Sequence, residues 1–360
     1  AAWLWLGAIN FILLGSRTTP LTAMDFKMLT SVFTVIGRYL NLFQLSLFLV
    51  VIVIVFASLV YIGLKMPRTK WNPHHAIMGA TLSFVVMLGS FNWAEATGNV
   101  STNFGNIADA YIDYGLAYSF ATSVVDKGIN KPDSYSTDHV NSVINSINEV
   151  LIDTTDVANT YHNGIPNIIF VQLESFFDVN RIKALTFSED PIPNMTSLRN
   201  NYSSGYLMVP SIGAGTVNTE FEILTGMNLD YFGAGEYPYK TILSESTVES
   251  YAYDLSELGY HTQAIHNNMG TFYSRHSVYP KLGFDGFTSI EYMNNVEYNE
   301  LGWADDSIMV PEIMNTLEST EGQDFIFAVT VQSHGQYPDY PVIENPKIDI
   351  YANSSIPPMN

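Results

Sequence analysis

The longest uncharged stretch of the chain constrains its fold more than any other feature of the sequence. Residues 42–64, LFQLSLFLVVIVIVFASLVYIGL, contain no charged side chain. A helix of ~20 such residues is long enough to cross a ~30 Å hydrocarbon core. We therefore predict a transmembrane helix here, with further spans at residues 1–15 and 76–93. Each of the three runs is also compatible with a helix buried in a protein core.

Charge is divided unevenly along the chain. Residues 1–92 carry six of the fifteen Lys and Arg but only one of the 35 Asp and Glu, a net charge of +5 that leaves −25 for the remainder. This acidic remainder argues against a nucleic-acid partner, because a phosphate backbone requires a positive footprint. The sequence has no cysteine, which excludes disulfides, thiolate metal sites and a cysteine nucleophile.

The loop between the second and third apolar runs indicates a topology. It reads KMPRTKWNPHH, and short loops rich in Lys and Arg remain in the cytoplasm. We therefore expect residues 16–40 on the outer face as an interfacial helix, and everything after Trp93 outside the cell. The chain starts inside an apolar run without Met, so we expect its N-terminus to be incomplete. The resulting prediction is a multi-pass protein of the cell membrane with an extracellular domain.

The pattern of the remaining chain is typical of an α/β domain that follows a connector. Residues 94–164 are polar, with a helical pattern at 136–153, and the character changes at IPNIIFVQLES, a run typical of a strand buried on both faces of a parallel sheet. Later strand patterns alternate with helical patterns, which indicates an α/β sandwich with a mostly parallel sheet. The later strands are expected at 259–267 and 324–335, and the helices at 246–258 and 307–319. The predicted regions are membrane helices at 1–93, a helical connector at 94–164 and the α/β domain at 165–360.

Polar residues follow the predicted strands where each apolar run stops. In an open α/β sheet the ligand site lies beyond the carboxyl ends of the strands. Glu174 ends the first strand, His266 and Asn268 close the second, and His334 follows the third. A carboxylate and imidazoles at such an edge are suitable ligands for a divalent metal, or partners of an anionic oxygen. Each of them can instead be an ordinary strand-end cap.

The stretch GAGTVNTEFE, residues 213–222, has two readings. Gly213 and Gly215 permit close backbone approach, and the following residues are helical in character, so Thr216 is expected at a helix N-terminus, where N–H groups favour an anion. Thr216 is then either an N-cap or a nucleophile, and a metal held by Glu174 would activate it in the second case. Spacing alone favours the cap. Thr219, Glu220 and Glu222 are interpreted as the start of the helix.

Four motifs in order resemble the lipoteichoic acid synthase family: NIIFVQLESF, GAGTVNTEFE, HNNMGTFYSR and TVQSHGQYP. Members are membrane-anchored phosphoglycerol transferases with the sulfatase-like fold of the alkaline phosphatase superfamily, and the resemblance covers nearly the whole chain. It implies transfer of glycerol phosphate from a phosphatidylglycerol-like lipid to a glycerophosphate polymer or glycolipid of the cell envelope. The reaction would pass through a phosphothreonine, by attack of Thr216 and then of an acceptor hydroxyl or water.

The resemblance also implies roles for individual residues. Glu174 and Thr216 would hold one catalytic Mn²⁺ or Mg²⁺, with Thr216 as the nucleophile. The implied phosphoglycerol contacts are His266, Asn268, Tyr273, Arg275 and His334. Asn268 and Tyr273 replace an aspartate and a tryptophan of the family, which leaves the polymer and the lipid donor open.

The family completes its metal site with an Asp-His pair late in the domain, and this sequence contains no such pair. We therefore expect a C-terminally truncated domain whose remaining metal ligands lie beyond residue 360, and an inactive fragment. Asp305 and Asp306 are interpreted as a loop and a helix cap. The alternatives are a phosphodiesterase or phosphoethanolamine transferase of the same fold, and an inactive envelope-binding protein. A sulfatase activity is disfavoured, because its formylglycine derives from Cys or Ser and the nucleophile position is Thr216.

Overall fold

The described residues of this computed structural model fall into two compact units. The first comprises Ala1–Ser146 with Asn228–Glu245, and the second comprises Ile147–Met227 with Ser246–Asn360. The predicted boundaries at residues 93 and 164 stay a prediction. The structure describes residues 2–15, 17, 19–28, 42–65, 73–97, 107–125, 128–129, 131–132, 134–152, 165–211, 215–233, 235–335, 337 and 345–352.

Long helices form at all three apolar runs of the first unit. They are α1 (Ala2–Leu14), α4 (Leu42–Lys65) and α5 (Pro73–Ala96), and the last two have 24 residues each. Among the residues that the structure describes, none of the helices combines the length and the apolar character that a membrane span requires. The predicted transmembrane spans are therefore not confirmed, although the helices themselves are.

The described part of the first unit also contains a short helix, two connector helices, the start of α8 (Thr137–Ile152) and α11 (Ile242–Glu245). In the segment predicted to be an interfacial helix, the described residues 17 and 19–28 form one short helix, α2 (Ala23–Lys27), and residues 29–41 lie outside the described residues. Arg17 pairs with Asp25 of α2 through two hydrogen bonds of 2.7 and 2.8 Å. The connector forms α6 (Ile107–Asp113) and α7 (Gly115–Val125).

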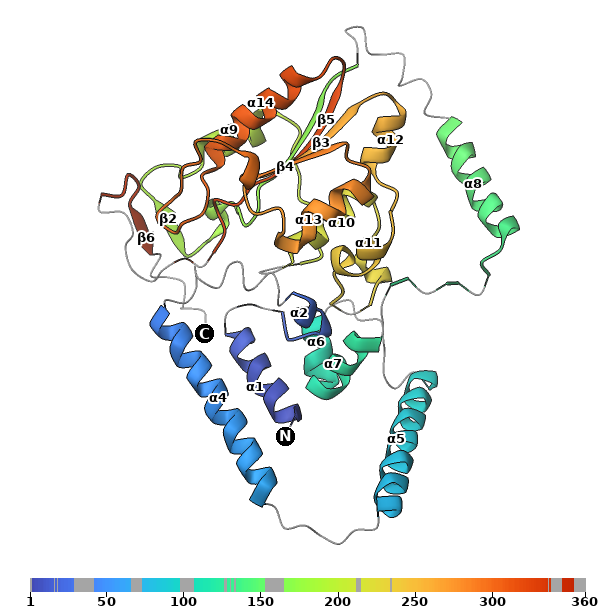
Figure 1. Cartoon of the computed structure of the whole chain (residues 1–360). Coiled ribbons are helices and arrows are strands. Elements are labelled where there is room, and N and C mark those ends of the chain that lie inside the picture. Colours follow the sequence, from blue (N-terminus) through green and yellow to red (C-terminus); the bar gives the residue numbers. More distant parts are fainter. Residues whose placement is uncertain are drawn as a thin grey trace. The chain divides into compact units, whose positions relative to one another are not determined.

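The second unit contains a four-stranded parallel sheet in the order β1-β5-β3-β4 (Figure 1). Its strands are β1 (Ile168–Gln172), β3 (His261–His266), β4 (Gly286–Ser289) and β5 (Asp324–Val329). The predicted α/β class and three of these strands are confirmed, and β4 is an additional strand. Gln172, Val329, His266 and Ser289 are register partners, so all four strands end at the same edge.

Helices and a small second sheet surround this sheet within the unit. Strands β2 (Leu185–Phe187) and β6 (Ile350–Ala352) pair antiparallel. The described helices are α9 (Pro193–Asn201), α10 (Thr216–Thr225), α12 (Tyr251–Glu257), α13 (Arg275–Val278) and α14 (Met309–Ser319), whereas α11 (Ile242–Glu245) belongs to the first unit. In Figure 1 the strands pass between α14 and α12.

Strand β5 forms the centre of the core. Its six residues are all buried, because alternate side chains of a strand point to opposite faces and both faces are covered. On one face Ile326 packs with Ile265 and with Met309 of α14. On the other, the rings of Phe325 and Phe284 stack with centroids 5.8 Å apart.

Strand β1 differs from the sequence-based expectation. Its apolar run predicted burial on both faces, yet its first four side chains are between 36% and 45% exposed. The physical reason is its place in the sheet, because within the described residues β1 pairs with β5 alone. The strand and its parallel direction are confirmed, and its burial was predicted wrongly.

Candidate active site

Two residues from separate sequence motifs meet beyond the end of β1. Glu174 is 5% exposed and lies two residues past the strand, and Thr216 is the first residue of α10. The Thr216 Oγ1 donates a hydrogen bond of 2.7 Å to the Glu174 Oε1. A hydroxyl and a carboxylate therefore form one polar centre at the start of a helix.

The structure places a residue other than Thr216 at the N-cap of α10. The N-cap position of α10 is held by Gly215, whose φ of 80° is a left-handed conformation that suits glycine. The interpretation of Thr216 as the cap is wrong, because its hydroxyl is directed at Glu174 instead of the helix. Gly213 lies outside the described residues.

The backbone after β1 is strained at the residue that follows Glu174. Ser175 has a φ of 61°, a conformation that costs a non-glycine residue about 1–3 kcal/mol.

Glu174 lies in an environment that disfavours its charge. Burial raises the pKa of its carboxyl above the ordinary value, and the nearby Glu220 carboxylate acts in the same direction. The positive charge of Arg275, the His334 imidazole and the hydrogen bond from Thr216 partly offset this rise in pKa. The carboxylate is thus surrounded by groups from three other parts of the domain: α10, α13 and the segment after β5.

A buried ion pair lies one helical turn beyond Thr216. The Arg275 Nε and Nη2 donate hydrogen bonds of 3.2 and 2.5 Å to the two oxygens of Glu220, and both side chains are fully buried. The Tyr279 hydroxyl donates a third bond, of 2.9 Å, to Glu220. Two parallel, charge-assisted bonds of this kind fix both position and orientation.

Sequence reasoning missed Glu220, which it interpreted only as part of a helix start. The signal was its spacing, because residues i and i+4 of a helix lie on the same face. Glu220 follows Thr216 by four residues, so a site at Thr216 implied that Glu220 faces the same interior. Arg275 was expected to contact the phosphate; in the structure it is fully buried, with donors directed at Glu220 and His266.

His266 is held as one neutral tautomer at the end of β3. Its Nδ1 lies 2.9 Å from the Val329 carbonyl oxygen and its Nε2 lies 3.0 Å from the Arg275 Nη1. Because an arginine only donates, Nε2 is the acceptor and Nδ1 carries the proton. Burial, reinforced by the charge of Arg275, holds the pKa of His266 well below its ordinary value.

This depressed pKa predicts a pH dependence of stability. In the unfolded state His266 has a pKa of about 6.5, so below that pH the unfolded state binds a proton that the folded state does not bind. The free energy of unfolding therefore falls as the pH decreases. Between pH 7.5 and 5.5, we expect His266 to account for a loss of about 1.4 kcal/mol in the free energy of unfolding, which His266→Gln should abolish. Urea denaturation in EDTA at the two pH values measures this difference.

The control for this experiment is His261→Gln, since His261 is exposed at the opposite end of the same strand. It should leave the pH dependence as in the unsubstituted protein. An unchanged loss of stability in His266→Gln would show that His266 is protonated in the folded state.

The remaining predicted site residues lie in the segments that follow β3 and β5. The His334 ring packs against Trp303 at a tilt of 43°, with ring centroids 4.4 Å apart, and its Nδ1 lies 2.6 Å from the Gly335 carbonyl oxygen. Tyr273 is buried, and its ring centroid lies 5.4 Å from the Arg275 guanidinium carbon. The Asn268 side chain accepts a bond from the Met269 N–H, so it shapes its own loop.

Two acidic residues interpreted as loop and cap have different roles in the structure. Asp305 caps the following turn by accepting from the Ser307 N–H at 2.8 Å, as expected. Asp306 instead accepts from the backbone N–H groups of Val331 and Gln332 and from the Asn267 amide at 2.9 Å. It therefore ties the segment after β5 to the segment after β3.

The donor set of Glu174 and Thr216 fits part of a metal site. A carboxylate and a hydroxyl oxygen are the hard ligands that Mg²⁺ and Mn²⁺ prefer. Across the described ranges of the chain, no group of three or more His, Cys, Asp or Glu is arranged to hold a metal ion. Two oxygen donors of a suitable kind are therefore present.

Comparison with known proteins identifies the domain. The sequence pattern of the Sulfatase family matches residues 166–353, more than half of the chain. The chain belongs to the sulfatase family. The sulfatase-like part of the predicted resemblance is thereby confirmed, and it covers β1, α10 and all the residues of the site.

Individual similarities extend beyond this family domain. A Rhizobium meliloti (strain 1021) protein assigned to cyclic beta-1,2-glucan modification is 30% identical over 247 residues, 69% of this sulfatase-family chain. The chain spans 36% of that relative's length.

Two solved structures are also similar. One is the phosphoglycerol transferase GacH of Streptococcus pyogenes in complex with sn-glycerol-1-phosphate, which is 23% identical with a TM-score of 0.49. The similarity covers 63% of this chain and 59% of the GacH chain. The other is the lipoteichoic acid synthase LtaP of Listeria monocytogenes, which is 22% identical with a TM-score of 0.38. This similarity covers 49% of this chain and 45% of the LtaP chain.

Proposed function

We propose that the full-length protein is a metal-dependent phosphoglycerol transferase. It would move glycerol phosphate from a phosphatidylglycerol-like lipid to a hydroxyl of a cell-envelope polymer. The observation that carries this proposal is the hydrogen bond between Thr216 and the buried Glu174 at the N-terminus of α10, inside a sulfatase-family domain. Free N–H groups at a helix start favour an anionic phosphate beside the hydroxyl.

Glu174 and Thr216 are the residues that would hold the metal. A divalent cation bound there supplies charge stabilisation for the transferring phosphoryl group and makes a hydroxyl more nucleophilic. The Mn²⁺ or Mg²⁺ of the sequence-based expectation matches the oxygen donors of both residues.

The transfer proceeds in two displacements at Thr216. In the first, the Oγ1 forms a bond to the phosphorus, its proton passes to Glu174 Oε1, and the bond from phosphorus to the diacylglycerol oxygen breaks. That oxygen takes up a proton and diacylglycerol leaves. In the second, an acceptor hydroxyl bonds to the phosphorus and releases its proton to solvent, the bond from phosphorus to Oγ1 breaks, and Glu174 returns its proton to Oγ1, which restores the threonine.

The buried network positions the nucleophile in this proposal. Glu220 on α10, Arg275 on α13 and His266 at the end of β3 are joined by hydrogen bonds, so the helix that carries Thr216 is held against the strand ends. The same hypothesis retains the expected substrate contacts, which are His266, Asn268, Tyr273, Arg275 and His334.

The acceptor is proposed from one relative, and the location is proposed from the access that the donor lipid requires. The relative assigned to cyclic beta-1,2-glucan modification makes a saccharide hydroxyl the first acceptor to examine. We place the catalytic domain at the outer face of the cell membrane, where a phosphatidylglycerol-like donor is accessible. Its strongly acidic composition supports a partner other than nucleic acid.

A donor-turnover assay tests the proposal. With fluorescent phosphatidylglycerol and cyclic beta-1,2-glucan, we expect diacylglycerol release together with phosphoglycerol on the glucan. EDTA should abolish both products, and added Mn²⁺ or Mg²⁺ should restore them, because the cation stabilises the transferring group.

The alternatives give distinguishable products in the same assay. Diacylglycerol with free glycerol phosphate and an unmodified glucan would indicate a phosphodiesterase. Turnover of fluorescent phosphatidylethanolamine in place of phosphatidylglycerol would indicate a phosphoethanolamine transferase. Absence of turnover with either lipid, with metal present, would contradict an enzymatic role and favour an envelope-binding protein.

A further inference from the structure

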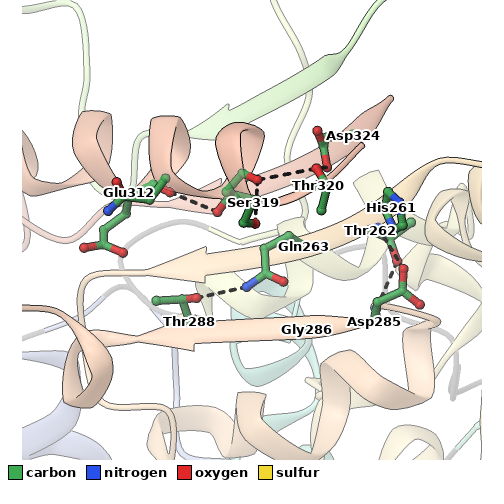
Figure 2. A pocket seen from close by; sticks show the side chains of 12 residues that line it. His261, Thr262, Gln263, Asp285, Gly286, Thr288, Glu312, Ser319, Thr320 and Asp324 are labelled. Atoms are coloured by element: carbon green, nitrogen blue, oxygen red, sulfur yellow. Dashed lines mark hydrogen bonds between the residues drawn. The ribbon is translucent and has the colours of Figure 1, made fainter. Parts of the chain in front are cut away.

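A pocket opens at the end of the sheet opposite to Glu174 and Thr216. Its volume is about 350 Å³, and α14, β3 and β4 line it (Figure 2). His261 and Asp324, two of its lining residues, are the first residues of β3 and β5 and are register partners. Another lining residue, Thr288, is the register partner of Ile265, so the pocket extends along β3 and β4 toward the edge where these strands end.

A glycine shapes one wall of this pocket. The Gln263 side chain lies between α14 and β4 and donates a bond of 2.9 Å from its Nε2 to the Thr288 Oγ1 (Figure 2). A Cβ at Gly286 would lie 2.1 Å from the Gln263 Oε1. Glycine at this position therefore leaves room for the amide across β4.

The pocket is rich in hydrogen-bond acceptors. The hydroxyls of Thr316 and Ser319 donate to carbonyls of their own helix, so they offer little to a ligand. Asp324 is 1% exposed and accepts only from the Thr320 hydroxyl, at 2.7 Å. Within the described residues, no hydrogen bond reaches the Glu312 carboxylate.

Charge restricts the ligand class. The twelve lining residues include three acids, Asp285, Glu312 and Asp324, and neither Lys nor Arg. Phosphates and other anions are therefore repelled, and a ligand must bring several donors. The volume is at the lower end of the ~300–1,000 Å³ of small-molecule sites. Asn315 adds an amide that both donates and accepts.

We propose that this pocket is an accessory site for a neutral sugar unit of the acceptor glycan. Sugar hydroxyls supply the donors that the carboxylates and the Gln263 carbonyl require, and they bring no negative charge. A polymer can occupy the pocket with one unit and present another unit at Thr216. The identity of the glycan rests on the proposed function, whereas the pocket and its chemistry do not.

Binding of cyclic beta-1,2-glucan to the full chain, measured by titration calorimetry without metal or lipid, tests this site. Glu312→Gln and Asn315→Ala should each raise the Kd about tenfold, the effect of losing one or two hydrogen bonds. The matched control is Glu318→Gln, the same change on the same helix outside the pocket, and it should leave the Kd unchanged. Gly286→Ala, which displaces Gln263, should weaken binding as well.

Equal glucan affinity in all variants would overturn the inference. So would binding of spermidine, but not glucan, that depends on Glu312, since the pocket would then be a cation site. If transfer is absent but glucan binding still depends on Glu312, the accessory site stands and the proposed function fails. If transfer is present and glucan affinity is the same in Glu312→Gln, only the accessory site fails.

Discussion

Thr216→Ala is expected to lower the rate of diacylglycerol release from fluorescent phosphatidylglycerol by at least ~10³-fold, the scale on which removal of a nucleophile acts. The physical reason is that the Thr216 hydroxyl, which donates a hydrogen bond to the buried Glu174, supplies the attacking oxygen. Alanine has no oxygen that could form a covalent bond to phosphorus. Thr216→Ser retains the oxygen and should keep part of the rate. Initial rates with saturating Mn²⁺ measure both variants.

The control lies one turn along the same helix. Thr219→Ala removes another hydroxyl from α10 and should leave turnover close to that of the unsubstituted enzyme. Mass spectrometry of a quenched reaction should find the glycerophosphate adduct on Thr216. Normal turnover by Thr216→Ala, or an adduct on Thr219, would contradict the assignment of the nucleophile.

The second large effect is expected on stability. Glu220→Gln leaves the fully buried Arg275 without its carboxylate, and breaking a buried ion pair in this way costs about 3–5 kcal/mol of the free energy of unfolding. Replacing both residues, as Glu220→Leu with Arg275→Met, removes the uncompensated charge and should recover much of that loss. Urea denaturation in EDTA compares the single and double variants.

An exposed ion pair provides the comparison. Arg199 and Asp178 form a salt bridge in which the Arg199 side chain is 40% exposed, so Asp178→Asn should cost at most ~1 kcal/mol. A loss for Glu220→Gln as small as this would show that Arg275 finds another partner. A double variant as unstable as the single one would show that packing, and not the unpaired charge, causes the loss.

The elements that sequence reasoning predicted best are those with strong local patterns. The helix at 136–153 and the strands at 259–267 and 324–335 are present as α8, β3 and β5. Periodicity depends only on neighbouring residues, so it is readable without the fold. Strand β4 was missed because its four residues carry too short a pattern.

Part of the candidate site followed from the same local logic. Glu174 and His266 were identified because parallel strands end at a common edge, and the structure places both there. The reading of Thr216 as a cap failed because the side-chain direction at a helix start depends on what faces it. In the structure Gly215 holds the cap position and Glu174 faces the hydroxyl.

The sequence by itself determined the alternation of strands and helices, the polar strand ends and the glycine-rich entry to α10, since each is encoded within a few neighbouring residues. Only the tertiary structure decided the pairing of Glu220 with Arg275, which are 55 residues apart, the tautomer of His266 and the exposure of β1. Those features depend on which groups meet across the fold and on how many sides of a strand are covered. Burial also shifts the pKa values of Glu174 and His266, and the burial of a side chain cannot be read from the order of residues along the chain.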